Sequence, residues 1–251
     1  MTLRKNIIYR FFSIILLSKG VSDINVVSYG WEVFERNSDS RTLALAQSSI
    51  GYPIQNPGTV LLNPALSLSH NNMIGLTHQS RMSGTSNSEF IGFDKYINDS
   101  SWVSVIILYE GVDGIPDTRG ALLDWGLDGI FGTFDVGEGN GSLDEGERLD
   151  VDKIRFFNQN IFGLYGAHSK IFNNWRIGFG LKIILHTIDK EFGIGAGLDI
   201  GAFRNYNNTG IGLIVKNLPS SGLIWESGNI EISPPSLNFG LHQKFSIKKY
   251  E

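Results

Sequence analysis

The fold is decided by two adjacent stretches, WRIGFGLKIILHT at residues 175–187 and FGIGAGLDIGA at residues 192–202. In both, apolar residues occupy every second position, and the positions between them hold mostly glycine with isolated charges such as Lys182 and Asp199. A period of two places alternate side chains on opposite faces of a strand, so the pattern predicts strands and not helices. The strands are also as long as the ~9–11 residues with which a tilted strand crosses a membrane.

The composition of the second face separates two kinds of all-β protein. A soluble sandwich usually carries many ionic side chains on its outward face, whereas here that face is mainly glycine. An apolar face toward lipid and a sparsely charged interior favour an antiparallel transmembrane β-barrel. A two-residue turn at Lys190 and Glu191 would then place Lys182 directly opposite Asp199. Because a one-residue slip would put a charge into lipid at ~2–4 kcal/mol, we expect these two residues to be cross-strand neighbours on the inner face.

The barrel is expected to occupy residues 73–251. A good turn at Asn173-Asn174 joins two of its strands, and Arg41–Ser49 is a candidate short helix. Besides the two deciding stretches, the alternation predicts strands at residues 73–82, 89–95, 101–110, 160–171, 211–215 and 237–247.

The N-terminus has the organisation of an export signal. A basic start with Arg4, Lys5 and Arg10 precedes an apolar run at residues 11–17 and small residues near Gly20. This run is too short to span a bilayer, so we expect residues 1–22 to be a cleaved signal peptide. Its removal takes four positive charges from a chain of net charge −4, leaving −8, which argues against nucleic-acid binding. The chain has no cysteine, so thiolate chemistry and disulfides are excluded.

A family resemblance adds to this interpretation. The pattern across residues 41–245 resembles the PorV/PorQ family, which is similar to the FadL-type outer-membrane hydrocarbon transporters. The Asn63-Pro64-Ala65 turn is the most specific of the matching pieces, and residues 23–72 would correspond to a plug-like segment. The other pieces are Arg41–Leu45, His78, Glu89–Gly92, Gly114–Pro116, Gly180–Ile183, Gly197–Gly201 and Val215–Leu218.

The resemblance implies a FadL-like barrel in the bacterial outer membrane. It implies passage of apolar small molecules, or a role in type IX protein secretion with secretion-system proteins as partners. Family members usually continue for several more strands, whereas this sequence stops at Lys248-Lys249-Tyr250-Glu251. Because unpaired strand edges are costly in lipid, the barrel is expected to be either small or cut short, and we favour the second alternative.

An acidic loop lies at residues 111–152 and holds 11 of the 25 acidic residues. Setting Gly141 at the sharp turn of an EF-hand-like loop places several oxygen-bearing side chains at ligand positions. Position one is Val136, so the match to the template is incomplete, and a solvated loop is the alternative. The spacing indicates a calcium site whose candidate ligands are Asp135, Glu138, Asn140, Asp144 and Glu147.

No catalytic pattern is present. The five histidines lack metal-ligand spacing, and no Gly-x-Ser-x-Gly or phosphate-binding Gly-Lys-Ser/Thr motif occurs. We therefore expect a protein that is not an enzyme. The leading hypothesis is an outer-membrane barrel for transport or export, and the alternative is a soluble, secreted β-rich binding or structural protein that calcium stabilises.

Overall fold

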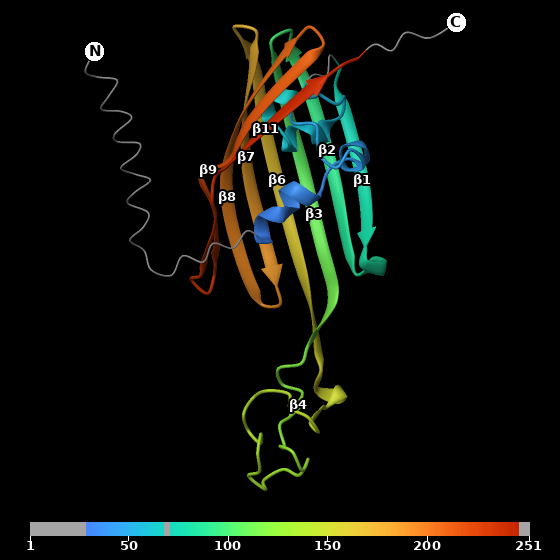
Figure 1. The fold of residues 1–251 in the computed structure, drawn as a ribbon, viewed down its shortest axis with the longest axis vertical. Coiled ribbons are helices and arrows are strands. Elements are labelled where there is room, and N and C mark those ends of the chain that lie inside the picture. Colours follow the sequence, from blue (N-terminus) through green and yellow to red (C-terminus); the bar gives the residue numbers. More distant parts are fainter. Residues whose placement is uncertain (1–28, 68–70, 246–251) are drawn as a thin grey trace, which may run out of the picture.

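One antiparallel sheet dominates the part of the chain that the computed structural model describes, residues 29–67 and 71–245 (Figure 1). The expected signal peptide lies outside these residues. The sheet has nine strands in the order β1-β2-β3-β6-β7-β8-β9, with β10 and β11 both paired to β9. The strands are β1 (Met73–Arg81), β2 (Ser86–Asn98), β3 (Ser101–Asp117), β6 (Arg155–Phe172), β7 (Trp175–Ile188), β8 (Glu191–Tyr206), β9 (Thr209–Trp225), β10 (Ile230–Ser233) and β11 (Ser236–Gln243).

The all-β, antiparallel architecture is confirmed, and each predicted strand that falls within the described residues is present. Most strands are longer than the alternation indicated, because polar residues at their ends also join the ladder. Asn173 and Asn174 form the β6–β7 turn with φ of 48° and 65°, in the left-handed region that asparagine tolerates. The short strand β10 was not predicted.

The expected β7–β8 register is wrong by two residues. Asp189 and Lys190 form the turn, and Asp189 adopts φ +52°, so that Glu191 pairs with Ile188 inside the ladder. Lys182 is consequently opposite Gly197, and Asp199 is opposite Gly180. A shift of two residues leaves every side chain on its predicted face, because the strand period is two.

The sheet is open within the described residues. β1 pairs only with β2, and β10 and β11 pair only with β9, so no hydrogen-bonded closure joins the two edges in this part of the chain. The closed barrel expected for residues 73–251 is therefore not seen.

Residues 29–67 form an N-terminal segment, which packs on one face of the sheet (Figure 1). We call this face the inner face. Apolar side chains of the segment and of the sheet make a shared core around Phe34, Val60, Ile106, Tyr165 and Ile184. The segment consists of the short helices η2 (Tyr29–Glu32), α2 (Val33–Arg36), α3 (Ser40–Ala44), η3 (Pro57–Leu61) and η4 (Pro64–Leu66).

The long hairpin of β3 and β6 extends beyond the rest of the sheet and carries the acidic loop (Figure 1). Within the loop, β4 (Leu122–Leu123) pairs with β5 (Arg148–Leu149), and η6 (Val151–Lys153) leads back to β6. A turn, η5 (Met82–Gly84), joins β1 to β2. The acidic loop thus stands apart from the inner face.

Candidate functional site

The inner face carries a buried ion pair at its centre. Lys182 Nζ lies 2.9 Å from Asp199 Oδ1, and the two side chains are only 5% and 2% exposed. Asp199 also accepts hydrogen bonds from the Tyr165 hydroxyl, at 3.3 Å, and from the Asn217 backbone N–H, at 2.9 Å. The two residues are diagonal neighbours on one face, as their chemistry predicted, although they are not directly opposite. A buried charge needs such partners, because losing them leaves it uncompensated.

Asn217 completes this network, and sequence reasoning did not single it out as a site residue. The register of β8 and β9 shifts twice between Ala196 and Ile200, and Asn217 adopts φ +60° in this irregular stretch. Its Oδ1 accepts hydrogen bonds from Lys182 Nζ at 2.6 Å and from Ser221 Oγ at 2.9 Å. This irregular stretch is a β-bulge. The sequence signal for it was a pair of consecutive polar residues, Lys216-Asn217, inside an alternating apolar strand.

The N-terminal segment covers the ion pair with two aromatic rings. Lys182 Nζ is 5.7 Å from the ring centroid of Trp31 and 5.9 Å from that of Phe34. The two rings are stacked on each other with centroids 5.9 Å apart. The ammonium group therefore contacts ring faces on one side and oxygen atoms on the other, an arrangement that excludes water from it.

The Asn63-Pro64-Ala65 turn docks directly on bare backbone of the sheet. Gly178 and Gly201 are opposite each other on β7 and β8, and a Cβ on either would overlap this turn. Asn63 is fully buried, and its Nδ2 donates to the Ala202 carbonyl at 3.2 Å and to the Ile50 carbonyl at 3.3 Å, while its Oδ1 accepts from Ala65 N. The turn that the sequence singled out is thus a structural anchor of the segment.

Two further glycine pairs receive the same segment. Gly75 and Gly92 are opposite each other on β1 and β2, and a Cβ on Gly92 would lie 2.6 Å from Pro57 Cβ. Gly212 and Gly240 are opposite each other on β9 and β11, and a Cβ on Gly240 would lie 2.6 Å from Gly51 N. The N-terminal segment therefore docks on three pairs of opposed glycines. We call these pairs, Gly178/Gly201, Gly75/Gly92 and Gly212/Gly240, the three glycine seats.

The acidic loop holds the candidate calcium ligands, and the structure brings only some of them together. Asn140 Nδ2 donates to Asp144 Oδ2 at 2.5 Å, and Glu147 accepts from Gly126 N at 2.8 Å and from Asp144 N at 2.9 Å. Asp135 accepts from Asp128 N at 2.9 Å, and Glu138 accepts from the backbone of residues 132 and 134. The carboxylates of Asp135, Glu138 and Glu147 thus bind backbone N–H groups, whereas that of Asp144 binds an amide side chain.

Asp124, which the spacing did not single out, organises the centre of this loop. Its carboxylate accepts from Gly139 N at 2.7 Å and from Gly141 N at 2.7 Å. These N–H donors, Gly141 first, lower the pKa of Asp124 from its usual value of 3.8. Over residues 29–67 and 71–245, no three His, Asp or Glu side chains gather closely enough to hold a metal ion. The calcium site stays a prediction from spacing.

Comparison of the chain with protein-family models, with curated proteins and with solved structures gave no match. No helix in the described ranges is long and apolar enough to cross a membrane.

Proposed function

We propose that this protein is a bacterial outer-membrane β-barrel protein whose exposed sheet face contacts lipid and whose inner face is filled by the N-terminal segment. Its role would be the passage of apolar small molecules or a part in protein export, the two roles that the PorV/PorQ resemblance implies. The observation that carries the proposal is a continuous apolar belt on the exposed face.

The belt consists of cross-strand rows with no polar side chain in them. One row crosses six strands and the adjacent row crosses seven, and both follow the hydrogen-bonded register. Soluble monomers rarely expose contiguous apolar patches of more than a few hundred Å². The first row is Leu76, Ile91, Ile107, Leu164, Ile183 and Ala196, and the second is Ile74, Phe93, Val105, Gly166, Leu181, Leu198 and Leu218.

Polar groups lie on both sides of the belt on the same exposed face. On one side, His78 Nδ1 lies 2.7 Å from Glu89 Oε1 on the neighbouring strand. On the other side, Lys95, His168 and Lys170 are exposed. Charged side chains that flank an apolar band are typical of strands whose ends reach the two membrane–water interfaces.

The inner face fits the same proposal. It carries both the apolar core that it shares with the N-terminal segment and the buried Lys182–Asp199 pair, and the segment covers it. The opposite face is apolar and yet exposed, and an exposed apolar face is what a lipid-facing wall requires. The proposal further requires the free edge of β1 to be paired in the membrane, because lipid cannot satisfy its backbone groups.

Fractionation of cells that express the whole chain tests the proposal. The protein should sediment with outer membranes, remain there after a carbonate wash, and migrate differently on a gel before and after heating. A known soluble periplasmic protein, expressed in parallel, controls for trapping in vesicles. Recovery of the chain in the soluble fraction would overturn the proposal and favour the secreted β-rich alternative.

A further inference from the structure

The exposed face of the sheet carries three cations at one margin of the apolar belt. Lys95 on β2, Lys170 on β6 and Arg204 on β8 all point outward, and neighbours among them are two strands apart. Within residues 29–67 and 71–245, none of the three has a carboxylate at ion-pair distance. We call these three residues the cation line.

The cation line crosses the sheet at the angle that a tilted strand makes with a membrane. Lys95 is level with His168 on β6, and Lys170 lies two residues further towards the β6–β7 turn. Lys170 is level with Ala202 on β8, and Arg204 lies two residues further towards the same end of the sheet. Two residues span about 6.6 Å along a strand and two strands about 9.6 Å across the sheet, so the line rises at about 35° to the ladder. Strands of outer-membrane barrels tilt by about 35–45°, so a membrane surface would cross the sheet along such a line.

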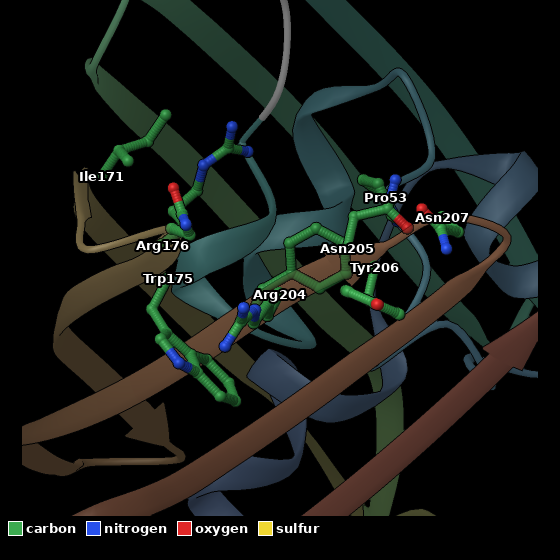
Figure 2. Close-up of a pocket in the computed structure, with 10 residues that line it drawn as sticks. Pro53, Ile171, Trp175, Arg176, Arg204, Asn205, Tyr206 and Asn207 are labelled. Carbon is green, nitrogen blue, oxygen red and sulfur yellow. The ribbon is translucent and has the colours of Figure 1, made fainter.

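Aromatic side chains accompany the cation line at this end of the sheet. The guanidinium carbon of Arg204 is 5.6 Å from a Trp175 ring centroid. Figure 2 shows these two side chains side by side, whereas Arg176 points away from them and is buried on the inner face. Phe172, which pairs with Trp175 in the ladder, and Tyr206 are exposed at the same end. Tryptophan and tyrosine beside basic side chains are typical of a membrane–water interface, where the rings lie at the headgroup level and the charges reach the water.

The two ends of the sheet differ in charge. At the end with the cation line, the β2–β3, β6–β7 and β8–β9 turns have two residues each, and Asp99 is the only charged residue in them. The opposite end carries the acidic loop, where residues 111–152 hold 11 acidic residues against Arg119 and Arg148 (Figure 1). An anionic surface would therefore attract the first end and repel the second.

From the angle of the line and this asymmetry, we infer that the cation line binds the headgroups of an anionic phospholipid leaflet. Each cation contacts a separate headgroup, because neighbours along the line are two strands apart. The acidic loop then lies on the side of the membrane away from that leaflet. The inference rests on the proposed membrane location and adds the lipid chemistry to it.

The test uses the full chain reconstituted in vesicles of equal parts phosphatidylcholine and phosphatidylglycerol. One of the two lipids carries bromine atoms near the headgroup end of its acyl chains, and the quenching of tryptophan fluorescence measures how often that lipid contacts Trp175. A basic side chain near an anionic surface favours binding about fivefold. Brominated phosphatidylglycerol should therefore quench several times more strongly than brominated phosphatidylcholine. Most of the quenching should disappear in Trp175→Phe, which identifies the reporter.

Two double variants separate the cation line from the overall charge of the chain. The first, Lys170→Gln with Arg204→Gln, should bring the two quenching values together. The matched control, Lys153→Gln with Lys190→Gln, removes two cations from exposed positions at the opposite end and should leave the preference unchanged. Equal quenching by both lipids in the unmodified chain, an equal loss in the two double variants, or unchanged quenching in Trp175→Phe overturns the inference. Equal quenching leaves the lipid-facing belt in place, whereas no quenching by either lipid overturns the membrane location as well.

Discussion

The glycine seats make a prediction that does not depend on where the protein resides. In Gly178→Ala, the three nearest atoms to the new Cβ are Pro64 C, Pro64 O and Ala65 N, all within 3.0 Å. All three are backbone atoms, so no side-chain rotation can relieve the overlap. The turn at Asn63 must move away from β7, and its hydrogen bond to the Ala202 carbonyl must lengthen with it.

The magnitude follows from a comparison with Gly166→Ala in β6. Gly166 also lies in a strand, and nothing lies within 4 Å of a Cβ added there. Replacing a strand glycine by alanine stabilises the chain by about 0.5–1 kcal/mol through backbone entropy, and this gain is common to both variants. The difference between them is therefore the overpacking cost alone, roughly 1–3 kcal/mol in favour of Gly166→Ala.

Denaturant unfolding in nonionic detergent, followed by tryptophan fluorescence, measures this difference. Limited trypsin digestion at Arg36 and Arg41 reports separately whether the N-terminal segment has loosened. We expect Gly178→Ala to unfold at lower denaturant and to be cut faster at these two sites. Equal midpoints and equal cleavage rates for the two variants would refute the docking of the segment on the glycine seats.

Three further predictions concern the ion pair, the loop and the belt. Lys182→Met should cost about 3–5 kcal/mol of unfolding free energy, and adding Asp199→Leu should restore most of it; a double variant as unstable as the single one would contradict this account. Below pH 3.8 the contribution of Asp124 to loop order should be lost as its lowered pKa is crossed, and a carboxyl NMR titration with a midpoint at or above 3.8 would disagree. In lipid, Ile183→Arg should cost about 2–4 kcal/mol and Ile97→Arg, beyond the belt, about 0–1 kcal/mol, measured by unfolding in vesicles. Equal costs would speak against lipid contact.

The strands and their faces could be predicted because a period of two is a local property. A register shift of two residues keeps Lys182 and Asp199 on the same face. Their shared face could therefore be predicted although the turn could not. The register itself depends on which two residues form the turn. The structure places the turn at Asp189 and Lys190, with Asp189 in the left-handed region, and the alternation alone does not separate this turn from one at Lys190 and Glu191.

The site could be predicted only in part, because its remaining members come from distant parts of the chain. Asn217 enters the network through a bulge in β9, and Trp31 through the folding of the N-terminal segment. Spacing in the acidic loop likewise missed Asp124, which lies 15 residues from its partner Gly139.

The glycine seats also determine which parts of this protein can vary. At each seat the sheet presents only backbone. Gly178 is met by main-chain atoms of Pro64 and Ala65, and Gly212 by main-chain atoms of Ile50 and Gly51. A main-chain contact does not depend on which side chain the segment carries. A comprehensive substitution library should therefore be asymmetric: almost no replacement of Gly178 or Gly212 should be tolerated, whereas many replacements of Ile50 should be.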